Sequence, residues 1–386
     1  MDTHLLIKEA FFKNFHREPD EFFSTPYRIS PLGAHSDHQL GKVTGFAIDK
    51  GIKMATSVNN DGSFRAISLQ FEGQKEWNLN DIPPIKQGDW ADYLRGVTLS
   101  LQKRYKLTRG FNASICGELP IGGLSSSATV TLTFLRALAF YNNIELSNEE
   151  LITIAKEAEN QYVGVSCGIL DQSCEVYCKE NMLLYLDTKD NQYQNIEAPK
   201  NATPFEILVV FSGLERSLAN SKFNNRVEEC HEAARLLSDG KENYLRNVPY
   251  ETYLKRKDKL PVNNQKRAEH FYTEFKRVEL GVEYFRKGDI VSFGKLMFES
   301  GDSSINNYES GCPELIRLHE IMKQTEGIYG GRFSGAGFKG CSIALINPKY
   351  RDSIIKNIEK LYLESFPHLK GKYQSFICCS VDGIGK

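Results

Sequence analysis

The chain has 386 residues, which is enough for about two domains with well-developed cores. Hydrophobic residues make up 41% of it and charged residues 25%, as in ordinary soluble globular proteins. The formal net charge of -1 gives no electrostatic reason to expect nucleic acid or an anionic membrane as a partner.

The amino-terminal stretch Met1–Phe15 alternates apolar and charged residues at roughly helical spacing. It lacks the uninterrupted apolar region of a secretory signal, and no apolar run in the chain approaches a membrane span. The nine cysteines are spread along the chain, mostly in apolar surroundings, which favours reduced thiols over a disulfide framework. We therefore expect a cytoplasmic protein.

The segment Pro26–Gly41, PYRISPLGAHSDHQLG, reads as a loop that carries an unusual density of functional side chains. Arg28, His35, Asp37 and His38 lie among two prolines and two glycines, where small neutral polar residues are the norm. Their donors and acceptors suit a hydroxylated ligand. A solvated loop with scattered charges is the alternative. A metal site is disfavoured because no HExxH or paired CxxC pattern accompanies these residues.

Strand-like and helical patterns follow through the first half of the chain. Ser147 and Glu150 have the spacing of a capping box at the start of one of the helices. The predicted strands are Val43–Asn59, Phe111–Leu119 and Met182–Leu186, and the predicted helices are Ser125–Tyr141 and Ser147–Tyr162.

The stretch Glu118–Ala128, ELPIGGLSSSA, ends a predicted strand and opens a predicted helix. Glycines let the backbone approach a phosphate, the helix amino terminus offers unpaired N–H groups, and three serines add hydroxyls for phosphate or magnesium. The stretch is not a Walker motif, because no GK[ST] follows the glycines. A serine-capped helix after a tight turn explains the stretch equally well by itself.

A third stretch, Glu159–Ser173, reads ENQYVGVSCGILDQS and passes from a helix into a glycine-broken turn. In such a turn Asp171 can point its carboxylate into a cleft. Glu159, if it faces the serine-rich loop, would complete a magnesium site. The alternatives are an aspartate that caps a helix and a glutamate that faces solvent.

The character of the sequence changes from Phe205, where the strand-like EILVVFSG precedes long charged amphipathic helices that continue to about Phe298. We therefore predict two domains, residues 1–203 and 204–386. After Gly330 comes a second glycine-rich stretch, which by itself is also consistent with strand crossings and turns. It leads into a strand at Ser342–Ile346, a further helix and a last strand near Ser375–Val381.

Three stretches in this order, PYRISPLGAHSDH, GGLSSSA and RFSGAGFKGC, resemble the signature motifs of the GHMP small-molecule kinases. ENQYVGVSCGILDQ narrows the likeness to the galactokinase branch, and the resemblance covers almost the whole chain. It implies an α+β fold with an amino-terminal domain similar to domain 2 of ribosomal protein S5 and a ferredoxin-like carboxy-terminal domain. ATP and sugar would meet between the two domains.

The resemblance also implies roles for individual residues. Asp171 and Arg28 match the catalytic pair, with Asp171 orienting or deprotonating the anomeric hydroxyl and Arg28 stabilising charge near the attacking oxygen. Ser127 and Glu159 match ligands of Mg²⁺. The implied nucleotide contacts are Gly122, Gly123, Leu124, Ser125, Ser126, Ser127, Gly335, Ala336 and Gly337, and the implied sugar contacts are Ala34, His35, Ser36, Asp37, Gly168 and Phe223.

The main departure from the galactokinase pattern is Ala34, because galactokinases carry there a glutamate that reaches the C6 hydroxyl of the sugar. Alanine removes a hydrogen-bond partner and a negative charge, so a C6 carboxylate escapes like-charge repulsion. The first and third motifs closely resemble those of plant galacturonokinases. We therefore expect a galacturonate 1-kinase that uses ATP and Mg²⁺. The alternatives are a 1-kinase for galactose, glucuronate or arabinose, and a sugar sensor without catalysis.

A sensor is disfavoured because it would not need the catalytic and magnesium residues together. The sequence offers His35, Lys42 and Arg226 as cations for a substrate carboxylate. The alternatives are that the histidine contacts neutral hydroxyls, that the lysine is solvated and that the arginine pairs with a neighbouring glutamate. Phe223 replaces a tyrosine of galactokinases. Lys339 replaces a glycine and is expected at a solvated tip, with a phosphate contact as the alternative. The motifs set neither the C4 epimer nor the oligomeric state.

Overall fold

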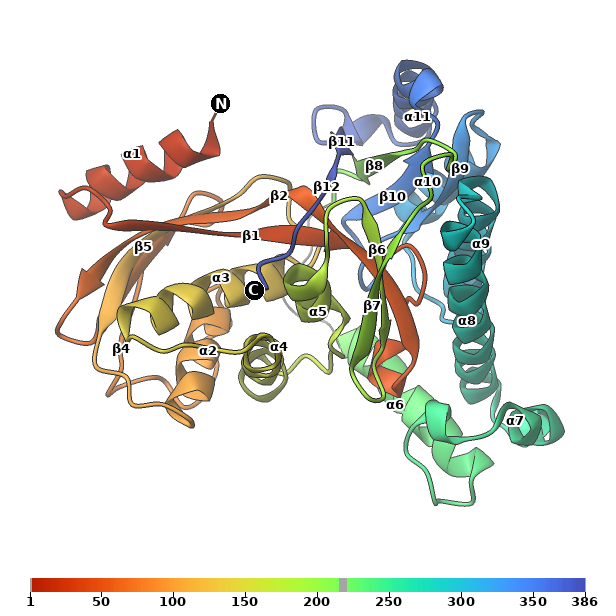
Figure 1. The fold of residues 1–386 in the computed structure, drawn as a ribbon, viewed down its shortest axis with the longest axis horizontal. Coiled ribbons are helices and arrows are strands. Elements are labelled where there is room, and N and C mark those ends of the chain that lie inside the picture. The colour runs from red at the N-terminus through yellow and green to blue at the C-terminus, as the bar shows by residue number, and fades with distance from the viewer. Residues whose placement is uncertain (1, 215–220, 386) are drawn as a thin grey trace.

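The computed structural model describes residues 2–214 and 221–385, which form two β-sheets with helices packed around them (Figure 1). The strands are β1 Glu21–Ile29, β2 Lys42–Asn59, β3 Ser63–Ser68, β4 Lys75–Asn78, β5 Gly110–Gly117, β6 Met182–Asp187, β7 Gln192–Glu197, β8 Glu206–Phe211, β9 Ile328–Phe333, β10 Cys341–Ile346, β11 Gln374–Cys378 and β12 Ser380–Val381. The helices are α1 Thr3–Phe15, α2 Asp92–Gln102, α3 Ser126–Tyr141, α4 Asn148–Glu157, α5 Leu170–Tyr177, α6 Ser221–Leu237, α7 Tyr250–Arg256, α8 Val262–Arg286, α9 Ile290–Asn306, α10 Pro313–Gln324 and α11 Arg351–Ser365.

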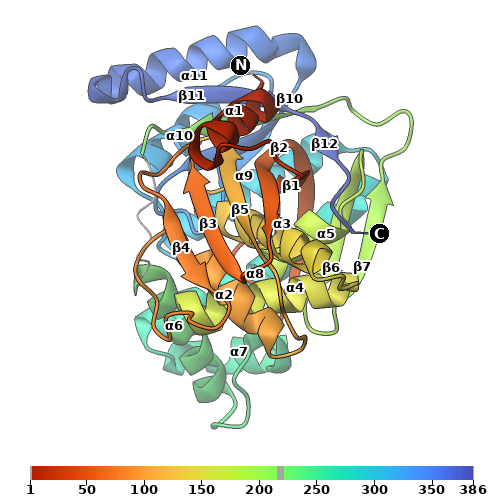
Figure 2. The same ribbon diagram turned by 90° about the vertical axis from the view of Figure 1, so that its left-hand side faces the viewer.

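The first sheet is built around the long strand β2, which pairs with β1, β5, β6 and β12. Its main path runs β4-β3-β5-β2-β6-β7. Helix α1 lies on one face of this sheet, and α2, α3 and α4 lie on the other (Figures 1 and 2). The buried apolar side chains of β3 and β5 come from alternate positions, Phe64 and Ala66 in β3 and Phe111, Ala113 and Ile115 in β5, as expected for strands with one face on the core.

The second sheet has the order β11-β8-β10-β9, and all of its pairings are antiparallel. Helices α8 and α9 run side by side next to it (Figure 1). Apolar residues of β8, α8 and β10 belong to the same buried cluster as those of β1 and β2. The two sheets therefore share a continuous core, and this core fixes the relative positions of the residues that lie between the sheets.

Most of the predicted elements are confirmed. The predicted strand at residues 43–59 and the predicted helix at 125–141 match β2 and α3 to within one residue. The capping box of Ser147 and Glu150 is present at the start of α4. The predicted helix continues beyond Glu157 as a π-helical turn, Ala158–Val163, which ends at Gly164 with φ 83°. Such turns are frequent at functional sites, and this one carries Glu159.

Two expectations are corrected. The segment after Pro26 does not begin as a loop, because residues through Ile29 continue β1 and pair with β2. The predicted last strand is in fact two strands, since β11 pairs with β8 and β12 pairs with β2 of the other sheet. Cys379 lies between them, where its N–H donates to the Asp49 carboxylate at 3.0 Å. Alternation of side chains cannot reveal a chain that changes sheets.

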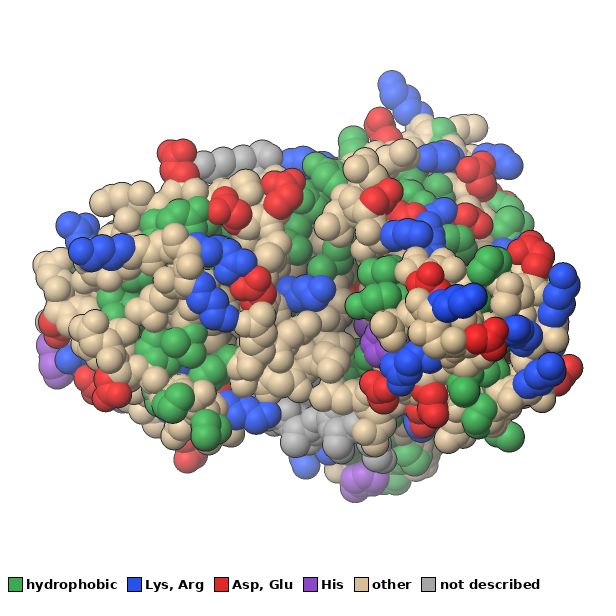
Figure 3. Space-filling model, turned by 90° about the horizontal axis from the view of Figure 1, so that it is seen from below, with side chains coloured by type: hydrophobic (Ala, Val, Ile, Leu, Met, Phe, Trp, Pro, Cys, Tyr) green, Lys and Arg blue, Asp and Glu red, His purple; other side chains and the backbone are tan. Residues whose placement is uncertain are grey.

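The remaining sequence expectations concern cysteines, membranes and domains. All nine cysteines are free thiols. In the part of the chain that the structure describes, no helix has the length and apolar composition needed to cross a bilayer. Acidic and basic side chains are interspersed on the face shown in Figure 3. The division after residue 203 stays a prediction; β8 opens the second sheet at Glu206, whereas β12 returns to the first.

Candidate active site

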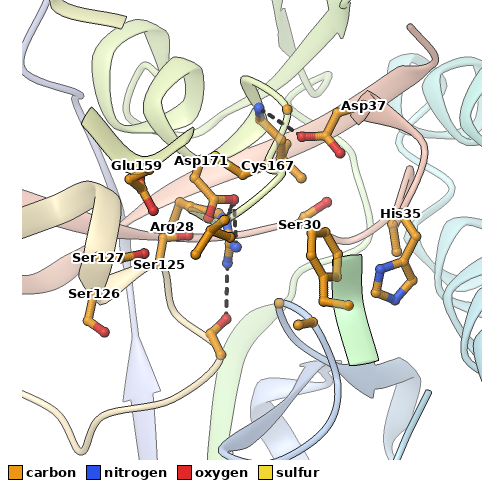
Figure 4. Close-up of a pocket in the computed structure, with 18 of the residues that line it drawn as sticks. Arg28, Ser30, His35, Asp37, Ser125, Ser126, Ser127, Glu159, Cys167 and Asp171 are labelled. Atoms are coloured by element: carbon orange, nitrogen blue, oxygen red, sulfur yellow. Dashed lines mark hydrogen bonds and ion pairs between the residues drawn. The ribbon is translucent and has the colours of Figure 1, made fainter. Parts of the chain in front are cut away.

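One pocket collects side chains from the segments that carry the predicted site residues (Figure 4). In Figure 4, Arg28 and Asp171 lie near its centre, with Glu159, Ser126 and Ser127 on one side and His35 and Asp37 on the other. Its wall is formed by Arg28, Ser30, Ala34, His35, Asp37, Gly123, Ser125, Ser126, Ser127, Glu159, Val165, Cys167, Gly168, Leu170, Asp171, Phe223, Arg332, Phe333, Gly335 and Ala336.

The predicted catalytic pair is in direct contact. Arg28 projects from β1, and its Nε and Nη2 lie 2.8 Å and 2.7 Å from Oδ1 of Asp171, at the start of α5. Its Nη1 donates to the carbonyl of Gly123 at 3.0 Å. Burial lowers the pKa of Arg28, but the charge and hydrogen bond of Asp171 outweigh this effect and raise that pKa above its usual value. Arg28 is therefore a permanent cation that joins the Asp171 carboxylate to the serine-rich loop.

The serine-rich loop has the backbone of an anion cradle. Gly122, Gly123 and Ser125 have φ angles of 141°, 86° and 65°, so the chain turns through left-handed conformations immediately before α3 begins. The hydroxyl of Ser125 is buried, with no hydrogen-bond partner among the described residues. A buried hydroxyl of this kind calls for an unseen partner, and a phosphate oxygen at the helix amino terminus would supply one.

The third motif packs against the second, backbone on backbone. A Cβ placed on Gly335 would lie 3.0 Å from the Cα of Gly123, and one placed on Gly340 would lie 2.5 Å from the carbonyl carbon of Gly122. Lys339 is exposed and does not line the pocket, as expected for a solvated tip. The glycines of the two loops therefore allow the close approach that holds the cradle in place.

His35 and Asp37 line the other end of the pocket. The His35 ring stacks on Tyr308 with centroids 4.0 Å apart, and burial lowers its pKa well below its usual value, so the ring stays neutral. The Asp37 carboxylate accepts from the N–H of His38 at 3.0 Å and from that of Leu170 at 3.3 Å. Burial, followed by the charge of Asp171, raises the pKa of Asp37. These groups offer neutral and acidic partners for ligand hydroxyls.

A substitution at Gly168 tests the role of the end of the pocket that His35 and Asp37 line. A Cβ on it would lie 2.2 Å from Oδ2 of Asp37, so Gly168→Ala must displace that carboxylate. From the substrates that the motif resemblance implies, we expect about a tenfold rise in the KM for the sugar, which corresponds to losing one charged hydrogen bond, with the KM for ATP unchanged. Gly73→Ala, where a Cβ meets nothing within 4 Å, is the control. Equal effects on both KM values would contradict the assignment of Gly168 to the sugar end.

Several predicted residues lie beside the pocket rather than on its wall. Ser36 is buried, and its hydroxyl donates to the carbonyls of Gly33 and Lys42 at 2.8 Å and 3.1 Å. The others are Gly122, which packs against Gly340, Leu124, which belongs to the core, and Gly337, which packs against the ring of Phe333.

Two of the cations considered for a substrate carboxylate are engaged elsewhere. Lys42 pairs with Glu279 at 2.8 Å, and Arg226 pairs with Glu229 at 3.0 Å, and neither lines the pocket. Arg332, the first residue of the third motif, lines the pocket, although the resemblance implied no role for it. Its signal in the sequence is an arginine within an otherwise apolar strand, directly before the third glycine-rich loop.

The donor set near the serines fits a magnesium ion. Ser127 and Glu159 line the same end of the pocket, and the Glu159 carboxylate accepts from Nε2 of Gln172 at 2.8 Å. Among the described residues, no group of three or more His, Cys, Asp and Glu is placed to hold a metal. A hydroxyl and a carboxylate suit Mg²⁺ in kinases, where nucleotide phosphates and water complete the coordination.

Comparison with known proteins gives consistent results. Residues 92–179 match the model of the GHMP kinases N terminal domain, and residues 282–363 match that of the GHMP kinases C terminal domain. The chain is 36% identical to the galacturonokinase of Arabidopsis thaliana, with 96% of this chain and 95% of that protein covered. It is 33% identical to a galactokinase of Clostridium perfringens (strain 13), with 97% of each covered.

Solved structures agree with these relatives. The structure of Lactococcus lactis galactokinase complexed with galactose superposes with a TM-score of 0.91 at 27% identity, covering 99% of both chains. The mevalonate kinase of Methanococcus jannaschii superposes with a TM-score of 0.66 at 18% identity, covering 94% of this chain and 98% of that one. The second likeness is one of fold alone.

Proposed function

We propose a substrate for this chain, which belongs to the GHMP kinase family and is a galactokinase-like sugar kinase. The proposal is that it phosphorylates D-galacturonate at the anomeric hydroxyl in the cytoplasm. The product would be galacturonate 1-phosphate, and ATP, the phosphoryl donor of GHMP kinases, would be converted to ADP. Identities of 33% and 36% to a galactokinase and a galacturonokinase do not fix the sugar. The sugar must be argued from the pocket.

The observation that carries the proposal is Ala34. It lines the sugar end of the pocket with a methyl group, at the position where the galactokinase pattern has a glutamate. Its peptide is held on both sides, because its N–H donates to Glu274 at 3.2 Å and its carbonyl accepts from Nε2 of His270 at 2.9 Å. The pocket therefore has room and no acidic side chain at this point, which favours a ligand that brings its own carboxylate.

The catalytic steps that we propose follow from the geometry of the centre. Asp171 would orient the anomeric hydroxyl and accept its proton as the oxygen attacks the γ-phosphorus and the bond to ADP breaks. Arg28, held as a cation by Asp171, would stabilise the charge that develops between the two oxygens. The backbone of the serine-rich loop would hold the phosphates. Ser127 and Glu159 would hold Mg²⁺, which when bound neutralises charge on the phosphates.

A substrate panel tests the proposed function. We expect ADP release with galacturonate to exceed that with glucuronate, galactose and arabinose. The measurement is kcat/KM for each sugar at saturating ATP. Faster turnover of galactose than of either uronate would overturn the proposal and leave a galactokinase.

Replacing Ala34 separates charge from size. Ala34→Glu places a second carboxylate beside the expected C6 carboxylate, and we expect kcat/KM for galacturonate to fall about tenfold or more because like charges in a binding site repel. Ala34→Gln has nearly the same size without the charge and is the matched control. If both variants lose galacturonate activity equally, steric exclusion rather than charge explains Ala34.

A further inference from the structure

A buried glutamate lies one helical turn after Asp171. Glu175 is the fourth residue after Asp171 in α5, so the two side chains lie on the same face of that helix. Glu175 is fully buried, and its Oε2 has no hydrogen-bond partner among the described residues. The nearby charge of Arg28 is already paired with Asp171. An ionised carboxylate is costly in such a place, so the surroundings favour a neutral acid.

The other oxygen of Glu175 contacts a threonine hydroxyl. Oγ1 of Thr129, on α3, lies 2.6 Å from Oε1 of Glu175 and 2.9 Å from the carbonyl oxygen of Ser125. A hydroxyl has one proton to donate, and a carbonyl can only accept. When Thr129 donates to Ser125, the short contact with Glu175 therefore needs the proton of a neutral carboxylic acid. Burial raises the pKa of Glu175 well above its usual value, in agreement with this assignment.

The hydrogen bonds of Thr129 end on the serine-rich loop. The carbonyl of Ser125 accepts from the N–H and from the hydroxyl of Thr129, both at 2.9 Å. Ser125 lines the pocket and has φ 65°, directly before α3 begins. Glu175 is not part of the pocket wall. It therefore reaches the wall only through Thr129, at the residue where the loop turns into the helix.

Helix α5 is thus attached to the serine-rich loop at two points. Arg28 makes the first link, from the Asp171 carboxylate to the carbonyl of Gly123. Thr129 makes the second link, from the next turn of α5 to the carbonyl of Ser125. A single link leaves the loop free to pivot about it, whereas two links fix its orientation. The loop is therefore oriented relative to the helix that carries the proposed base.

We infer that Glu175 is a positioning residue for phosphoryl transfer, a neutral acid that acts through Thr129 to hold the serine-rich loop in the orientation that receives the phosphates of ATP. This inference rests on the proposed function, in which the loop binds those phosphates, but not on the identity of the sugar. Small displacements of a reacting group lower the rate of transfer. Loss of the second link should therefore impair the use of ATP and leave sugar binding intact.

The test removes each member of the second link. We expect Thr129→Val and Glu175→Leu each to lower kcat/KM for ATP about tenfold, as for the loss of one hydrogen bond, with the KM for the sugar unchanged. Thr133→Val is the matched control, because Thr133 is buried one turn further along α3 and its hydroxyl donates only to the carbonyl of Thr129, at 2.7 Å. Equal losses of kcat/KM in Thr129→Val and Thr133→Val would overturn the inference, as would an equal rise in both KM values.

A rescue variant tests the neutral state of the acid and covers the case in which Glu175→Leu does not fold. Glu175→Gln keeps the shape and a hydrogen-bond donor without a charge, so we expect its kcat/KM for ATP to stay within about threefold of the wild type. A tenfold loss in Glu175→Gln would show that a charge is needed and would overturn the assignment. All rates are measured with the sugar that the wild type turns over fastest. A sugar other than galacturonate would then contradict the proposed function and leave this comparison intact.

Discussion

Replacing Asp171 with asparagine is expected to lower kcat by roughly a hundredfold to ten-thousandfold, the usual contribution of a general base. Asparagine keeps an oxygen at Oδ1, so the hydrogen bonds from Nε and Nη2 of Arg28 can persist. The charge is lost, and with it the group that would take the proton of the anomeric hydroxyl. Steady-state ADP release with saturating galacturonate and ATP measures the effect.

The same variant separates chemistry from folding. Asp171 is partly exposed, with 29% of its side-chain surface accessible, so Asp171→Asn should melt close to the wild type and bind ATP with similar affinity. Asp190→Asn, in an exposed turn, is the control. A fall in kcat of less than about threefold would show that Asp171 orients Arg28 but does not take part in proton transfer.

The four motifs were enough to predict the family and the α+β fold, and the comparisons confirm both. They succeeded because each motif fixes local backbone chemistry, such as the left-handed turn at Gly123 that precedes α3. What they missed depends on contacts between distant segments. The register of β12 with β2 brings the end of the chain to the first sheet, and no local pattern encodes that pairing.

The site shows the same division between local and distant signals. The approach of Arg28 to Asp171 joins residues 143 positions apart, and only the resemblance made it predictable. Arg332 opens the third motif, but its place in the pocket wall appears only when β9 is folded against the other segments. Lys42 and Arg226, both proposed on proximity in sequence, instead have acidic partners outside the pocket.

Gly340→Ala is expected to cost the protein roughly 2 to 5 kcal/mol of unfolding free energy and to weaken ATP binding. Gly340 has φ 100°, which an alanine adopts only with strain, and its Cβ would lie 2.5, 2.6 and 2.8 Å from backbone atoms of Gly122. Gly340 has little freedom to retreat, because its carbonyl accepts from both the N–H and the hydroxyl of Ser212 at 2.9 Å and 2.7 Å. The serine-rich loop at Gly122 must therefore move.

The control for this variant isolates the contact between the loops. Gly240 has φ 81°, and a Cβ on it meets nothing within 4 Å, so Gly240→Ala carries the backbone strain without the collision. Urea unfolding and ATP calorimetry on both variants give the difference, and we assign to the collision only what Gly340→Ala loses beyond Gly240→Ala. If the two lose the same stability and both bind ATP normally, the third motif does not support the cradle. If Gly340→Ala alone loses ATP affinity, the packing of one glycine loop on the other sets the geometry at which phosphate is held.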